Sequence, residues 1–157
     1  MGLSQQKVTR TEQRLPKRQL MELIVSWPAS PIDHLSEPDA VFVTESRIIR
    51  EIAQRESCVI VGRCADYVLR DNPNLIRVFI HLSEEKEIKA AMLDRSLSQA
   101  EAAWYVREKN YERATHYRYY AHGMWGNSDA YDLIINTTHI SIEQAVSLIL
   151  QLSKSKT

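Results

Sequence analysis

The strongest constraint on this chain is a short apolar stretch, S-C-V-I-V-G-R, at residues 57–63. Residues 58–61 are apolar, mostly β-branched and without alternating polar positions, which is typical of a strand buried on both faces of a parallel sheet. Gly62 ends the run, and Arg63 and Asp66 follow just beyond it. Because ligands of open α/β sheets collect at the carboxyl ends of the strands, these two side chains could hold a phosphate and a base amino group. A strand, a turn and a solvated salt bridge explain the same residues without any ligand.

Composition and charge narrow the class of protein. A length of 157 residues suits one domain with a single core, and we expect that domain to span residues 1–157. The content of 44% apolar and 25% charged residues is ordinary for a soluble globular protein. The formal net charge of zero predicts no general attraction to nucleic acid or to a membrane surface. No apolar run is long enough to cross a bilayer and no signal peptide begins the chain, so we expect a cytoplasmic protein.

Two cysteines, Cys58 and Cys64, lie in or beside the expected strand. Neither has a histidine or a third cysteine nearby at the spacing of metal ligands. We therefore expect buried or partly buried thiols, with neither a zinc site nor a disulfide. The sequence assigns no metal ligand and no catalytic residue.

Helix and strand signals alternate along the chain, which predicts an α/β fold. Two weakly marked helices, from Ser4 and from Pro16, fall in the poorly defined residues 1–35; Ser36 then caps a helix that should run to about Gln54. The strand at 58–61 should pair in parallel with the next strand through a right-handed crossover. The remaining expected elements are a strand at 75–80, a helix from 83, a helix from 98 to about 120, a strand at 131–136 and a helix from 141 to 152.

Five motifs occur in order from about Ser36 to the C-terminus. They are V-I-V-G-R-C-A-D-Y-V-L from residue 59, I-R-V-F-I-H from 76, E-R-A-x-x-Y-x-Y-Y from 112, W-G from 125 and Y-D-L-I-I-N-T from 131. The ordered set resembles the cytidylate kinase-like family of the P-loop nucleoside monophosphate kinases. The resemblance implies a three-layer α/β fold with a parallel sheet. It also implies transfer of the terminal phosphoryl group of MgATP to a nucleoside monophosphate such as CMP, so ATP and Mg²⁺ are the cofactors of the parent family.

The resemblance also implies roles for individual residues. Arg63 falls on the family's glycine–arginine pair and would contact the phosphate of the acceptor monophosphate. Asp66 stands where related bacterial cytidylate kinases have an acid that reads cytosine, although the spacing here differs.

Residues 98–126 correspond to the lid that closes over both nucleotides in the family. Arg113 falls on the lid's arginine–alanine motif and would contact phosphate across the closed site, whereas Asn110 replaces the usual aspartate three residues earlier. The same helix carries Arg107, Lys109 and Arg118, and a solvated basic face is the plain alternative for these cations. We expect the tyrosines of the third motif to pack rather than to stack on a base, and the W-G motif has no assigned role.

The family's glycine-rich phosphate loop has no counterpart in this sequence. The chain has only four glycines, Gly2, Gly62, Gly123 and Gly126, and none stands in a G-x-x-x-x-G-K-[ST] setting. We expect a chain cut at its N-terminus that lacks the usual first strand and is inactive alone. In the family that strand lies between the strands at 58–61 and 76–80, so their exposed edges would pair directly or be covered by a second copy, which makes a homo-oligomer possible. The rival hypothesis is a non-catalytic nucleotide-binding or dimerisation module.

Overall fold

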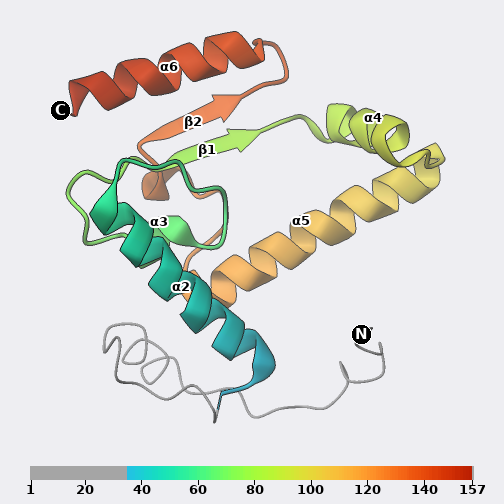
Figure 1. Cartoon of the computed structure of the whole chain (residues 1–157). Helices are drawn as coiled ribbons and strands as arrows, with labels where there is room; N and C mark the ends of the chain where they lie inside the picture. Colours follow the sequence, from blue (N-terminus) through green and yellow to red (C-terminus); the bar gives the residue numbers. More distant parts are fainter. Residues whose placement is uncertain (1–34, 157) are drawn as a thin grey trace. The chain divides into compact units, whose positions relative to one another are not determined.

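The structure is a computed structural model that describes residues 35–156 (Figure 1). It is a mixed α/β fold with a small parallel sheet. The helices expected from Ser4 and Pro16 lie outside the described residues. The chain divides into two compact units, Met1–Val68 and Leu69–Thr157. The elements are α2 (Glu37–Arg55), α3 (Ala65–Val68), β1 (Val78–His81), α4 (Glu84–Arg95), α5 (Gln99–Ala121), the 3-10 helix η2 (Ser128–Ala130), β2 (Leu133–Asn136) and α6 (Ile142–Ser155).

Helix α2 of the first unit begins and ends close to the predicted residues. Ser36 is its N-cap: the Asp39 backbone N–H donates to the Ser36 hydroxyl, which in turn donates to the Asp39 carboxylate over 2.7 Å. Phe42 is buried in the second turn of the helix. After Arg55 the chain is extended at Glu56, whose N–H still donates to the Ile52 carbonyl.

The predicted strand at residues 58–61 is absent, and this prediction is wrong. The Val59 and Val61 side chains are 93% and 88% exposed, and Cys58 is exposed as well, contrary to the buried or partly buried thiol that we expected. The crossover pairing of this segment with the next strand is also wrong, because within residues 35–156 the sheet contains β1 and β2 alone. A strand needs a hydrogen-bonded neighbour, and apolar composition cannot supply one.

The second unit contains the sheet. Strands β1 and β2 are parallel and in register from Val78 opposite Leu133 to His81 opposite Asn136, so both strands expected here are confirmed with shorter bounds. Ile135 is only 2% exposed. Figure 1 shows α6 running along β2.

Helices α4 and α5 pack against each other in the same unit. The N-terminus of α5 carries a capping box, in which the Glu101 N–H donates to the Ser98 hydroxyl and the Ser98 N–H donates to the Glu101 carboxylate. Ala91 and Ala102 are buried between the helices, where small side chains allow close approach, and Val106 completes this core. Among the described residues, no helix is long and apolar enough to span a membrane.

Candidate functional site

A strained turn follows the exposed segment of the first unit. Gly62, Arg63 and Cys64 all have positive φ, at +72°, +56° and +52°. The left-handed region costs a residue that carries a Cβ about 1–2 kcal/mol, and such strain gathers at functional sites. A Cβ added at Gly62 would meet no atom within 4 Å, so this glycine serves the backbone conformation and not a close contact.

The turn presents Arg63 to solvent. Its side chain is 64% exposed, and the Arg63 Nη1 atom lies 3.2 Å from the Glu45 Oε1 atom of α2. Glu45 is half-buried and the Arg63 end of the pair is exposed to solvent, which weakens the ion pair, so Glu45 orients the guanidinium and a ligand can still compete for it. A phosphate, with more charge and more acceptor oxygens than a carboxylate, could replace Glu45.

Two further groups accompany Arg63 at this turn. Cys64 is buried, and burial, followed by the negative charges of Asp66 and Glu45, raises the pKa of its thiol to about 12. The thiol therefore stays protonated at neutral pH and is a packing group, not a nucleophile. Asp66 lies half-buried in the first turn of α3, three residues after Arg63 in the sequence.

The predicted lid residues lie on α5 in the second unit, where acids already engage two of the four cations. The Arg107 Nε atom donates to Glu84 over 2.8 Å, and the Lys109 ammonium donates to Glu112 over 2.5 Å. Arg118 lies near the end of the helix and makes no ion pair with any residue of the described part. The observed contacts of Arg107 and Lys109 therefore agree with the plain alternative, a solvated basic face.

Asn110 connects the two helices of the hairpin. Its side-chain amide donates to the Glu87 carboxylate over 2.9 Å, and its carbonyl oxygen accepts from Arg113 over 2.9 Å. An aspartate at this position would repel Glu87, whereas the amide serves both neighbours. The departure from the family pattern thus suits the packing of α4 on α5 and orients Arg113.

The W-G motif, which had no assigned role, has a structural one. The Phe79 ring of β1 lies 5.3 Å from the Trp125 ring and 5.0 Å from the Tyr131 ring, measured between centroids. A Cβ at Gly126 would come within 3.1 Å of the Phe79 ring, and Gly126 has a φ of +79°. Both the backbone conformation and the close Phe79 ring favour glycine at this position. The tyrosines of α5 pack as predicted: Tyr120 is buried, with the Tyr119 and His116 rings each 4.7 Å from its own.

The carboxyl ends of β1 and β2 hold a polar cluster that sequence reasoning missed. The Thr137 N–H and hydroxyl both donate to the His81 carbonyl, and the buried Thr138 hydroxyl accepts from the Ser83 N–H. The Lys86 ammonium donates to the Thr138 carbonyl. The N-T-T sequence that ends β2 was the available signal, because polar residues directly after a parallel strand lie at the edge where ligands bind.

A dedicated magnesium site is not found in residues 35–156. No three histidine, cysteine or acidic side chains gather there in an arrangement that could hold a metal ion.

Three comparisons with known proteins bear on the fold and the family. The curated proteins give no significant match. A crystal structure of an uncharacterized protein from Eubacterium ventriosum ATCC 27560 is similar with a TM-score of 0.72 at 24% identity, over 96% of this chain and 79% of the other, which supports the fold. The model of the cytidylate kinase-like family matches residues 1–139, and the chain therefore belongs to the cytidylate kinase-like family.

Proposed function

We propose that this chain binds a nucleoside monophosphate, with CMP as the leading candidate, and that Arg63 holds its phosphate. The observation that carries the proposal is the exposed Arg63 guanidinium on the strained turn at residues 62–64. A planar guanidinium matches a phosphate with two parallel hydrogen bonds, which a single half-buried carboxylate partner does not prevent.

Asp66 is the proposed reader of the base. A carboxylate accepts hydrogen bonds, so it suits the exocyclic amino group of cytosine and disfavours the carbonyl that uracil has in its place. Its half-buried position beside the turn supports this role.

The lid residues are proposed as further phosphate ligands, by resemblance to the family and its three-layer fold. Arg113, oriented by Asn110, is the leading candidate for a further phosphate contact. Arg107 and Lys109 would first have to leave Glu84 and Glu112, whereas Arg118 has no ion pair to break within the described residues. The contribution of Arg107 and Lys109 to binding should therefore be smaller than that of Arg113.

The family's reaction is phosphoryl transfer from MgATP, in which bound Mg²⁺ and ATP supply the charge neutralisation and the phosphoryl group. None of the four glycines stands in a phosphate-binding loop. We therefore propose that a protein of these 157 residues binds the acceptor without phosphorylating it, which favours the non-catalytic nucleotide-binding module. A coupled assay with MgATP and each common monophosphate tests this, and turnover in the ordinary kinase range of roughly 1–100 s⁻¹ would contradict it.

Calorimetric titration of CMP tests the binding proposal. Charge-assisted hydrogen bonds contribute about 1.5–3 kcal/mol, so Arg63→Ala should weaken binding roughly 10- to 100-fold. Arg55→Ala is the matched control, because Arg55 is similarly exposed, at 68%, and pairs with an acid of α2, Glu51, over 3.4 Å. Asp66→Asn should lower the preference for CMP over UMP. Equal affinity in the wild type and Arg63→Ala, or no binding by either, would refute the proposal.

A further inference from the structure

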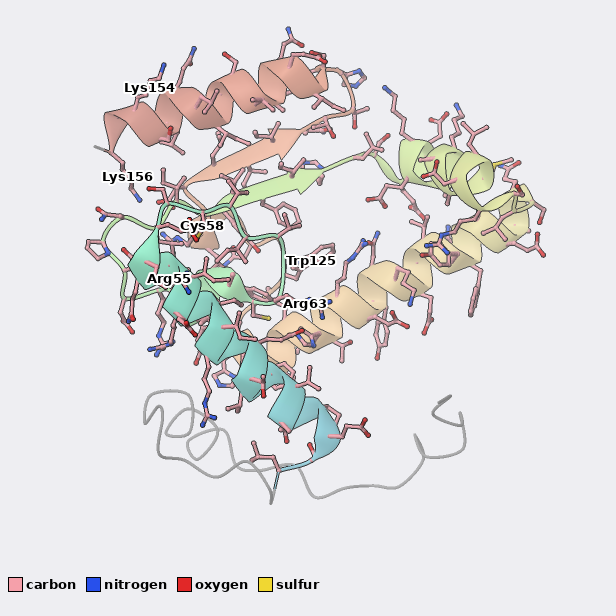
Figure 2. All side chains as sticks on the ribbon, viewed as in Figure 1. Arg55, Cys58, Arg63, Trp125, Lys154 and Lys156 are labelled. Atoms are coloured by element: carbon pink, nitrogen blue, oxygen red, sulfur yellow. The ribbon has the colours of Figure 1, made fainter. Side chains whose placement is uncertain are left out.

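We propose that Glu87 is a positioning residue for Arg113, which it holds in place through the Asn110 amide without neutralising the positive charge. The inference rests on the proposed function, in which Arg113 contacts a phosphate, and adds a residue of α4 that lies in none of the five motifs. The three side chains belong to one helical hairpin, and Figure 2 shows side chains of α4 and α5 in the angle that the hairpin encloses.

Hydrogen bonds link the three side chains in a fixed order. The Glu87 carboxylate accepts from the Asn110 Nδ2 atom over 2.9 Å, and the Asn110 Oδ1 atom accepts from the Arg113 Nη1 atom over 2.9 Å. An ionised carboxylate only accepts and a guanidinium only donates, so the amide satisfies both neighbours in only one of its two orientations. Glu87 therefore fixes which end of the amide faces Arg113.

The charge of Arg113 is treated differently from that of the neighbouring α5 cations. Arg107 and Lys109 are each paired directly with a carboxylate, from Glu84 and Glu112 respectively. Arg113 has a neutral amide oxygen as its partner and makes no ion pair within the described part of the chain. Its guanidinium is therefore oriented and still carries an uncompensated charge, which suits a phosphate ligand.

The surroundings of Glu87 suit it to hold the amide. Glu87 is half-buried in the first turn of α4, and its partner Asn110 on α5 is half-buried as well. No cation of the described residues pairs with Glu87, so Asn110 does not compete with an ion pair for the carboxylate. Partial burial strengthens a hydrogen bond to a charged group, because water competes less for it. This hydrogen bond thus anchors the exposed Arg113 to the hairpin.

The affinity for CMP tests the inference through the sign of the effect. Glu87→Ala removes a negative charge, which by electrostatics alone should strengthen the binding of an anionic nucleotide. We expect the opposite, a loss of roughly three- to tenfold, because the orientation of Arg113 depends on about one ordinary hydrogen bond. Glu87→Gln keeps an acceptor oxygen for Asn110 and should retain most of the affinity. Calorimetric titration of the full chain measures the wild type and both variants.

Two controls separate the positioning of Arg113 from support of the hairpin. Glu84 is the matched control, because it lies in the same turn of α4 and also bridges to α5, where Arg107 donates to it over 2.8 Å. Glu84→Ala should not weaken CMP binding. In an Arg113→Ala background, Glu87→Ala should have no further effect, because it acts only through that guanidinium.

The mobility of the Arg113 side chain gives a measurement that needs no ligand. NMR relaxation of the Arg113 Nε–H group should show a more mobile guanidinium in Glu87→Ala than in the wild type or in Glu84→Ala. Unchanged mobility in Glu87→Ala, equal losses of CMP affinity from Glu87→Ala and Glu84→Ala, or a loss that persists without Arg113 would overturn the inference.

Failure of the inference is distinguishable from failure of the proposed function. A loss of CMP affinity with Arg113→Ala but none with Glu87→Ala would overturn the role of Glu87 alone. No binding of CMP by the wild type, or no loss with Arg113→Ala, would overturn the proposed phosphate contact and the role of Glu87 with it.

Discussion

Two four-residue apolar runs, residues 58–61 and β1 (Val78–His81), look alike in sequence and differ in structure. Both are rich in β-branched residues, yet only β1 is a strand. β1 has β2 as a parallel neighbour and the Trp125 and Tyr131 rings against Phe79. Residues 58–61 have no such neighbour within the described part of the chain. The difference teaches that a hydrogen-bonded neighbouring strand, and not apolar composition, makes a segment a strand.

Truncating one side chain in each region should give the largest difference in stability loss between the sheet and residues 58–61. Ile135 of β2 is nearly fully buried, so Ile135→Ala should lower the free energy of unfolding by about 2–5 kcal/mol through lost contacts and a cavity. Val59 is exposed, so Val59→Ala should change it by less than about 0.5 kcal/mol. Urea unfolding at low protein concentration, where association is minimal, measures both. Similar losses in the two variants would mean that residues 58–61 are buried in solution.

The two positive-φ glycines sharpen the same contrast. Gly62 and Gly126 have φ of +72° and +79°, but only at Gly126 would a Cβ meet the Phe79 ring. Gly62→Ala should therefore cost about 1 kcal/mol of unfolding free energy for the backbone alone, whereas Gly126→Ala should cost about 2–3 kcal/mol by adding a clash. The measurement is the denaturation midpoint at constant slope. Equal costs would show that the aromatic cover of β1 yields freely.

The ionic support of the sheet gives a smaller, pH-dependent effect. The Asp132 carboxylate accepts from the Arg77 backbone and guanidinium and lies 3.6 Å from the Lys156 ammonium. Partial burial raises the pKa of Asp132, but the Arg77 hydrogen bonds and charge, with the Lys156 charge, outweigh it and lower the pKa overall. The stabilisation is therefore fully present above the unfolded pKa of about 4 and is lost as the pH falls through the lower folded pKa.

Asp132→Asn tests that dependence. It should cost about 1 kcal/mol of unfolding free energy at neutral pH, and much less under acid conditions where the wild-type carboxyl is also neutral. Unfolding of both proteins across this pH range is the check. A pH-independent difference would assign the loss to geometry instead of charge.

Local sequence signals predicted the starts of these helices correctly, because the capping interactions that begin a helix involve residues only three positions apart. The Ser36, Ser98 and Ser141 caps each accept a backbone N–H from three residues ahead, and each helix begins where predicted. The ordered motifs likewise identified the family, and the lid residues were expected on the helix that bears them.

Only the tertiary structure decided which apolar run is a strand, because a ladder needs partners that are distant in sequence. β1 pairs with residues more than fifty positions away in the sequence. The local sequence at residues 58–61 does not indicate that such a partner is missing from the described sheet. The same holds for Gly126, whose need for glycine comes from the Phe79 ring, and for Asn110, whose amide suits Glu87 of another helix. Sequence determined what each segment prefers, and contacts between segments determined which preference was realised.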